Sequence, residues 1–335
     1  MPSSIPLSPP GVDLRPGRPP VLRADLTGDA ASWAAEHRDA LRAVVTEHGA
    51  VLVRGLALGD PDTAGAVLRE LAGGPPMTEK EAFAARRTYP GGVYSSAKWP
   101  PSQPMCMHHE LSYTLEFPGL MMFACIEAPA VGGATALADA PTVLGALPTD
   151  LVERFLRQGW LLTRTYNEDI GASLTDSFGT EDRAAIEAYC RASAIAFEWQ
   201  PDGGLRTRQR RSAVVRHPVT GRRCWFNQIA FLNEWTLAPE VREYLVDVYG
   251  ADGLPFNTRY GDGTPLEEDT VRLLNEVYEA HTVREPWQSG DLLLVDNVRT
   301  AHSREPYEGP REVLVAMADP VRLADCSPTV EVTPV

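Results

Sequence analysis

The chain has 335 residues, of which 44% are hydrophobic and 23% are charged, and its formal net charge is −14. This composition is typical of a folded globular protein and excludes a disordered or fibrous chain. The acidic balance also argues against a nucleic acid partner, because duplex binding depends on neutralising phosphates with basic side chains.

No apolar run approaches the roughly 20 residues of a membrane helix. The opening residues, MPSSIPLSPPGVDLRPGRPP, do not show the charged start and apolar stretch of a signal peptide. We therefore expect a cytoplasmic protein with no membrane partner. The five cysteines are scattered and odd in number, which favours reduced thiols over a disulfide framework or a zinc site.

The first part of the chain changes from an arm to a helix and then to strands. Residues 1–25 are rich in Pro, Gly and Ser, and we expect them to form an extended N-terminal arm. Residues 29–48 carry apolar side chains at helical spacing and lead into the apolar strand AVLVRGL. Between 93 and 140 strand-like segments dominate, namely VYSSAKW, MCMHHELSY, LMMFACIEAP and GATALADA.

The second part of the chain alternates helical and strand-like segments. Helices are expected at about 141–157, at 181–192 and, in two pieces, within 238–281. The strand-like segments are GWLLTRTY, SAVVRH, CWFNQIAF, DLLLVDN and EVLVAMAD. Many short strands with inserted helices predict a mainly β fold, with a sandwich or jelly-roll core flanked by helices, in a single domain at 26–335.

Two histidines and a glutamate interrupt the strand-like segment MCMHHELSY. In a strand, alternate side chains share a face, so His108 and Glu110 would lie about 6.6 Å apart on one face, with His109 on the other. A strand histidine is more often a hydrogen-bonded structural residue than a metal ligand, and the pair alone is weak evidence. A zinc protease would need a second histidine four residues after the first on a helix, which this segment does not have.

A third metal ligand is offered by His302, just after the apolar strand DLLLVDN. Two histidines and one carboxylate on a sheet form the facial triad of non-haem Fe(II) oxygenases. Iron of this kind takes electrons from a 2-oxo acid to use dioxygen, and Arg311 could bind the far carboxylate of that acid with a guanidinium fork. Thr135, which follows two glycines, could add a hydroxyl donor. Taken alone, Arg311 would more often be a surface arginine.

Three segments carry a resemblance to a known family. MHHELSYTLEFPGLMMFACIEAPAVGGATALADA, HPVTGRRCWFNQ and GDLLLVDNVRTAHSREPYEGPREVLVAM together resemble the taurine dioxygenase-like (TauD/TfdA) family, and in particular its SyrP-like and clavaminate-synthase-like amino-acid hydroxylases. The resemblance covers about 40–320. It implies a double-stranded β-helix, a cupin-like jelly roll, that binds Fe(II), 2-oxoglutarate and dioxygen. It also implies His108, Glu110 and His302 as iron ligands, and Arg311 and Thr135 as 2-oxoglutarate-binding residues.

Two comparisons within the resemblance narrow the chemistry. The taurine enzyme has a sulfonate-binding arginine four residues after the one that matches Arg311, whereas this chain has Val315. A sulfonate substrate is therefore not supported. Related halogenases replace the metal-binding carboxylate with Gly or Ala to admit chloride, whereas this chain keeps Glu110, so halogenation is not expected.

The segments YSSAKWPPSQPM and CWFNQIAF are expected to form the walls of the substrate site. Polar side chains in or near them could orient a substrate, although strand-end hydrogen bonds or turns would explain each equally well. These candidates are Ser95, Ser96, Gln103, His109, Asn227 and Gln228. Strand alternation turns His109 away from the metal, so it would be either a neighbour of the ligands or exposed.

The segment from Arg206 to Arg223 is locally basic in an acidic chain. One interpretation is a solvated hairpin. The other is a docking surface for an anionic partner, such as a phosphopantetheine carrier protein that presents a tethered amino acid.

These observations predict an Fe(II)/2-oxoglutarate-dependent hydroxylase. Its substrate would be an amino acid or amino-acid-derived intermediate of natural-product (antibiotic) biosynthesis, free or carrier-bound, and succinate and CO2 would be released. Desaturation, epoxidation or cyclisation would use the same cofactors. Two alternatives of another class are a zinc or manganese isomerase or hydrolase on the same fold, and a binding module without turnover.

Overall fold

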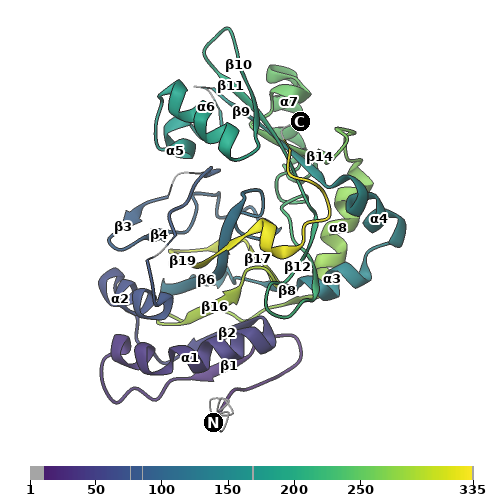
Figure 1. Ribbon diagram of the computed structural model, residues 1–335. Helices are drawn as coiled ribbons and strands as arrows, with labels where there is room; N and C mark the ends of the chain where they lie inside the picture. The colour runs from purple at the N-terminus through teal and green to yellow at the C-terminus, as the bar shows by residue number, and fades with distance from the viewer. Residues whose placement is uncertain (1–10, 76, 85, 168–169, 334–335) are drawn as a thin grey trace.

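The computed structural model describes residues 11–75, 77–84, 86–167 and 170–333. The protein is mainly β with several helices, as expected. Figure 1 shows helices α1 and α2 against one side of a large sheet, and helices α5 and α6 at the opposite end of the molecule.

The large sheet has seven strands in the order β1-β2-β16-β6-β19-β4-β3. Its strands are β1 (Val21–Arg23), β2 (Ala50–Arg54), β3 (Thr88–Tyr89), β4 (Val93–Ser95), β6 (Glu116–Glu127), β16 (Leu292–Asp296) and β19 (Glu312–Arg322). Strands β1 and β2 are parallel, and the other neighbours are antiparallel.

Two four-stranded sheets and two small ladders complete the β structure. The second sheet contains β5 (Met105–His108), β8 (Leu137–Asp139), β15 (Thr282–Val283) and β17 (Thr300–Arg304) in the order β15-β8-β17-β5. The third sheet contains β9 (Trp160–Tyr166), β10 (Ala196–Trp199), β11 (Leu205–Arg211) and β14 (Phe256–Tyr260) in the order β10-β11-β9-β14. The ladders pair β12 (Val214–Arg216) with β13 (Arg223–Trp225), and β7 (Val131–Gly132) with β18 (Tyr307–Glu308).

Most of the α-helices begin after an Asp or Ser whose side chain caps the first turn. The α-helices are α1 (Ala30–His48), α2 (Pro61–Ala72), α3 (Ala140–Ala146), α4 (Thr149–Gln158), α5 (Leu174–Phe178), α6 (Arg183–Ala192), α7 (Pro239–Tyr249) and α8 (Glu268–Ala280), with short 3-10 helices η1 (Glu234–Thr236), η2 (Ala251–Gly253) and η3 (Leu323–Cys326). In α1, the Asp29 carboxylate accepts a hydrogen bond from the Ser32 amide, and Gly49 ends the helix at a φ of 86°.

The large sheet is covered on both faces. On one face Val51, Val53 and Leu292 join a buried cluster with α1 and α2. On the other face Leu52 and Leu293 join the main core together with residues of the second sheet. All five residues of β2 and all five of β16 are consequently buried, which explains why both segments read as unbroken apolar runs.

Several expected boundaries differ in the structure. The helix expected at 141–157 is two helices, because Leu147 and Pro148 separate α3 from α4. Residues 1–10 of the expected arm lie outside the described residues, and Val21–Arg23 already pairs with β2, before the expected end of the arm at 25. Helix α2 was not expected.

The basic segment from Arg206 to Arg223 is not one solvated hairpin. Its first part is β11, an inner strand of the third sheet that alternates buried and more exposed residues. Arg211 is fully buried and donates hydrogen bonds to the carbonyl oxygens of Tyr113 and Ser193. The interpretation was wrong for this part, because alternation in a strand buries every second side chain whatever its charge, provided that its donors find acceptors. The second part does form a hairpin, in which β12 pairs with β13 and residues 218–223 are exposed.

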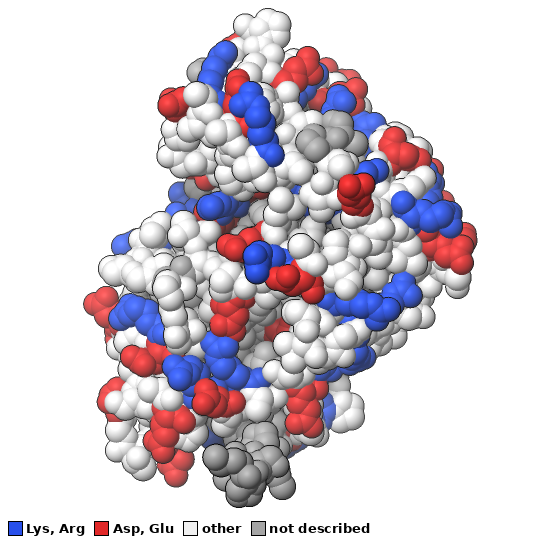
Figure 2. Space-filling view, in the orientation of Figure 1, with Lys and Arg blue, Asp and Glu red and all other residues white. Residues whose placement is uncertain are grey.

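Charges on the surface are mixed. Acidic and basic side chains of the described residues are interspersed over the face drawn in Figure 2. Within the described ranges, none of the helices has the length and apolar character needed to cross a bilayer.

Candidate active site

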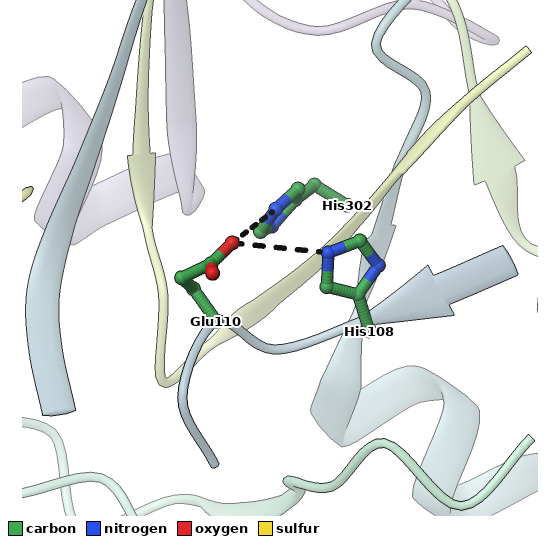
Figure 3. A group of neighbouring side chains, drawn as sticks. All are labelled: His108, Glu110 and His302. Carbon is green, nitrogen blue, oxygen red and sulfur yellow. Dashed lines mark ion pairs between the residues drawn. The ribbon is translucent and has the colours of Figure 1, made fainter. Parts of the chain in front are cut away.

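Pairing of two strands brings the histidines together. Strand β17 runs antiparallel to β5 with His302 directly opposite His108, and the two ring centroids are 4.4 Å apart. Figure 3 shows both rings directed toward the carboxylate of Glu110. Residues separated by 194 positions (302 − 108) thus become direct partners in the ladder between β17 and β5.

Glu110 reaches this point from a turn, which corrects the expected strand geometry. Strand β5 ends at His108, and Leu111 adopts a left-handed φ of 54°. The amide of Asn297 fixes the turn, because Asn297 Oδ1 accepts from the Glu110 amide at 2.7 Å and Asn297 Nδ2 donates to the Glu110 carbonyl at 2.9 Å. One carboxylate oxygen, Oε2, consequently lies 3.9 Å from His108 Nε2 and 3.6 Å from His302 Nε2.

The three side chains form a buried donor set. They are only 6%, 7% and 4% exposed in the order His108, Glu110 and His302. The Nδ1 of His108 lies 2.8 Å from the Cys106 carbonyl oxygen, which places the proton on Nδ1 and leaves the Nε2 lone pair facing the cluster.

The charges within this cluster are also arranged for a cation. Burial, with the His302 ring beside it, lowers the pKa of His108 to about 3, so its imidazole is neutral at physiological pH. Burial alone would raise the pKa of Glu110, but Arg86 and the two imidazoles outweigh it and lower that pKa to about 2. A carboxylate and two imidazoles whose ligand atoms lie within 4.8 Å of one another fit an Fe(II) ion.

Two adjoining cavities flank the cluster and share Arg86, Ala97, Met105, His108 and Glu110. One, the arginine cavity, is lined in addition by Ser96, Phe123, Thr135, His302, Arg304, Arg311 and Val315. The other, the aromatic cavity, is lined in addition by Glu79, Phe83, Trp99, Tyr113, Gln228, Phe231 and Phe256. The cluster therefore lies between a cationic space and a mainly apolar one.

Arg311 is oriented by the turn that precedes Thr135. Its Nε donates to the carbonyl oxygen of Gly133 at 3.1 Å. Gly132 and Gly133 have φ values of 68° and 69°, and a Cβ on Gly132 would lie 2.2 Å from the Pro306 carbonyl oxygen, so this turn requires glycine. Burial, assisted by the neighbouring Arg304, lowers the pKa of Arg311 to about 10, and its guanidinium is still cationic near neutral pH.

The sequence matches the family described as "Taurine catabolism dioxygenase TauD, TfdA family" over residues 13–317. The chain belongs to this family. The dapdiamide synthesis protein DdaC of Enterobacter agglomerans is 33% identical over 278 residues, which are 83% of this chain and 84% of that protein. A clavaminate synthase-like protein of Arabidopsis thaliana is 29% identical and covers 83% of each chain.

Solved structures of TauD/TfdA-like proteins share the fold. PvcB of Pseudomonas aeruginosa superposes with a TM-score of 0.53 at 16% identity, covering 92% of this chain and 89% of PvcB. A putative alpha-ketoglutarate-dependent taurine dioxygenase of Burkholderia xenovorans gives a TM-score of 0.51 at 16% identity, covering 95% and 92% of the two chains. The family and the His–Glu–His cluster confirm the expected cofactors of the reaction, Fe(II) and 2-oxoglutarate with dioxygen.

The residues expected to bind substrate separate into two groups. Ser96 lines the arginine cavity and Gln228 lines the aromatic cavity. Gln228 also donates from Nε2 to the His109 carbonyl oxygen. The other four line neither of these two cavities. The side chain of Ser95 accepts from the Arg87 amide, and that of Asn227 donates to the Ala213 carbonyl oxygen, whereas Gln103 contacts Arg304 through its backbone carbonyl oxygen.

His109 is neither exposed nor directed at the cluster. It is fully buried, and its Nδ1 lies 2.6 Å from the carbonyl oxygen of Asn297. Burial lowers the pKa of His109 to about 4. Of the two expected positions the exposed one was wrong, because the turn at 109–111 packs this ring into the core beside Phe226. His109 is instead a neighbour of the cluster, since it contacts Asn297, which also binds Glu110.

Three residues of the site were missed from the sequence. Asn297 fixes the turn that carries Glu110, and Arg86 and Glu79 extend from Glu110 into the aromatic cavity. Asn297 carried a signal, since a buried amide at the end of an apolar strand needs partners for its donors and acceptors. Arg86 and Glu79 lie in a segment without periodicity, and nothing in the sequence distinguishes them from surface residues.

Proposed function

We propose that the protein is an Fe(II)/2-oxoglutarate-dependent oxygenase that hydroxylates an amino acid or amino-acid-derived intermediate of natural-product biosynthesis. His108, Glu110 and His302 would bind the iron. The observation that carries the proposal is the convergence of these three buried donors between a cationic and an aromatic cavity. The names of two similar proteins, a dapdiamide synthesis protein and an oxygenase of an isonitrile synthetic pathway, support a natural-product substrate.

The residues of the arginine cavity suit 2-oxoglutarate. Arg311 would bind the far carboxylate with its guanidinium fork, and Thr135, which is 7% exposed, would add a hydroxyl donor. Arg304 adds positive potential from the same wall. Val315 faces this cavity where a sulfonate-binding arginine would otherwise lie.

The aromatic cavity suits the substrate. Phe83, Trp99 and Phe231 provide apolar contacts that exclude water, and Gln228 provides a polar group for orientation. Ser96 could add a second polar group from the adjoining arginine cavity. The bound iron and 2-oxoglutarate supply the oxidising chemistry, in which a substrate C–H, 2-oxoglutarate and O2 become C–OH, succinate and CO2. The chain's own part is to hold one C–H bond beside the metal and keep water away.

Other outcomes at the same site remain as the alternatives. Desaturation, epoxidation or cyclisation would need the same cofactors and differ only in the fate of the substrate after oxidation. A non-oxidative zinc or manganese protein, or a binding module, would leave Arg311 and Thr135 without a task. The double-stranded β-helix is part of this proposal, and the packing of the large sheet on the second sheet around one core supports it.

Anaerobic addition of Fe(II) and then 2-oxoglutarate to the metal-free protein tests the proposal. A visible metal-to-ligand charge-transfer band is expected for the wild type and for His281→Ala, which changes a histidine at the end of α8. No band is expected for His302→Ala, which also should release no succinate in air. An absent band in the folded wild type would favour the non-oxidative alternatives.

The substrate could be an intermediate that is tethered to a carrier protein. Arg206 and Arg208 lie on the outer face of β11, and among the described residues neither forms an ion pair. With Arg259, which pairs with Asp252 at 2.7 Å, they line a cavity of about 260 Å³. The two remaining arginines suit an acidic partner or a phosphate group. Salt-sensitive binding of an acidic, phosphopantetheine-loaded carrier protein should weaken in R206E/R208E. Equal binding by R206E/R208E and the wild type would count against this docking surface.

A further inference from the structure

Arg86 extends the charged network outward from the cluster of ligands. Its Nη2 donates to Glu110 Oε1 at 3.1 Å, and its Nε lies 3.1 Å from Glu79 Oε2. The side chains of Arg86, Glu110 and Glu79 are only 11%, 9% and 10% exposed. A guanidinium so far from water needs acceptors for its donors, and here two carboxylates flank it, so the three side chains depend on one another.

The two oxygens of Glu110 therefore have different tasks. Oε2 faces His108 Nε2 and His302 Nε2, whereas Oε1 is occupied by Arg86. Without that donor the carboxylate could rotate about its last bond or present both oxygens to a cation, because terminal carboxylate torsions are broad. Arg86 thus limits Glu110 to one ligand oxygen and one orientation.

We propose that Arg86 is a positioning residue for Glu110 and that Glu79 holds Arg86 in place. This inference rests on the proposed function, since it takes Glu110 as a metal ligand. Partners of this kind commonly contribute 10- to 100-fold to metal affinity when they orient a ligand. The site needs this restraint because Glu110 lies on a turn, beyond the end of β5, and its side chain has no ladder neighbour to confine it.

A competing role for Arg86 is direct binding of an anionic substrate, because it lines both cavities. The two roles differ in a measurement that contains no substrate. A substrate-binding arginine would leave the affinity of the metal-free protein for a divalent cation unchanged. A positioning arginine would change that affinity and also the geometry of the bound ion.

The experiment is a titration of the metal-free full-length protein with Mn(II), followed by electron paramagnetic resonance, with Co(II) absorption as a second measurement. Arg86→Gln should weaken Mn(II) binding roughly 10- to 100-fold and change the Co(II) spectrum. Arg86→Lys should recover part of the affinity, since it keeps the charge without the fork. Glu79→Gln should weaken binding less than Arg86→Gln does.

The matched control is Arg87→Gln, which changes the neighbouring arginine, an exposed residue that lies over Tyr89. It should bind Mn(II) as the wild type does. The proposal would be overturned if folded Arg86→Gln kept the wild-type Mn(II) affinity and the wild-type Co(II) spectrum. It would also be overturned if folded Glu79→Gln and folded Arg86→Lys both did so. Failure of the wild type itself to bind Mn(II) would instead refute the assignment of Glu110 and the two histidines as ligands.

Discussion

Adjacent residues of this site have opposite tasks. His108 directs Nε2 at Glu110, whereas His109, one residue later, is buried against Phe226 and the carbonyl of Asn297. The difference arises because β5 ends between them and the chain turns. A pair of adjacent histidines in a sequence therefore indicates a candidate metal ligand, but it does not show which of the two imidazoles faces the metal site.

Arg311 provides a prediction for the arginine cavity. Arg311→Ala should weaken 2-oxoglutarate binding by roughly 10- to 150-fold, since a hydrogen bond to a charged group contributes about 1.5–3 kcal/mol. The measurement is an anaerobic titration of the charge-transfer band with 2-oxoglutarate at saturating Fe(II). Arg322→Ala, at an exposed arginine paired with Asp325, is the control and should behave as the wild type does. An unchanged midpoint in Arg311→Ala would refute the role of this residue.

Glu79 provides a prediction of pH dependence. Burial raises the pKa of Glu79 to about 7, against the attraction of Arg86. Below about pH 7 the folded protein then holds a proton on Glu79, which pairs with Arg86 as a carboxylate only above that pH. The unfolded chain releases this proton near pH 4.5, so this residue lowers the free energy of unfolding as pH rises from about 4.5 to 7.

Urea unfolding of the metal-free protein at several pH values measures this effect. The wild type should lose up to about 3 kcal/mol relative to Glu79→Gln between pH 4.5 and 8, because one pKa unit corresponds to about 1.4 kcal/mol. A difference between the two proteins that stays constant with pH would show that Glu79 does not titrate in this range.

At the scale of elements, turns decide the geometry of the site as much as strands do. Strand β7 and its glycine turn place the Gly133 carbonyl under Arg311, and the turn after β16 places Asn297 against Glu110. Asp296 supports that second turn, since its Oδ1 accepts from the Val298 and Arg299 amides. The apolar pattern predicts strands such as β16, but it does not predict the turns that follow them or the site residues that these turns place.

Gly132→Ala tests the glycine turn. A left-handed alanine costs about 1–2 kcal/mol, and its Cβ would also lie 2.2 Å from the Pro306 carbonyl oxygen. Gly221→Ala is a matched control, because Gly221 has the same φ of 68° and no atom within 4 Å of a Cβ. Thermal unfolding and 2-oxoglutarate titration should show a larger loss for Gly132→Ala than for Gly221→Ala. Equal losses would mean that the close approach to Pro306 relaxes freely.

At the scale of the whole molecule, the helices that stabilise the large sheet and the cluster of candidate metal ligands lie on opposite faces of that sheet. Helices α1 and α2 cover one face, and the main core and the second sheet with its cluster lie on the other. Leu68→Ala, in the fully buried part of α2, should lower the free energy of unfolding by about 2–5 kcal/mol. The charge-transfer band of the folded protein should not change.

The control for this prediction is Val241→Ala, at an exposed position of α7, which should cost little. Urea unfolding and the anaerobic band provide the two measurements. A lost band in folded Leu68→Ala would mean that the helical face and the metal cluster are coupled more closely than their separation by the sheet suggests.

The sequence by itself determined the kinds of groups in this site and their order along the chain. Spacing and residue type identified His108, Glu110 and His302 as candidate ligands, and apolar runs located β2, β6, β16 and β19. These are local properties, since the spacing of apolar side chains in a segment indicates its secondary structure and its buried face.

Only the tertiary structure decided which atoms meet. The register of β17 against β5, the turn that directs Glu110 back toward the histidines, and the ion pairs of Arg86 with Glu79 and Glu110 all depend on contacts between distant segments. A single side chain such as Arg86 has the same local pattern whether it is solvated or buried. Its partners are decided when the whole chain packs, because burying a charge is tolerated only where the fold brings acceptors or opposite charges to it.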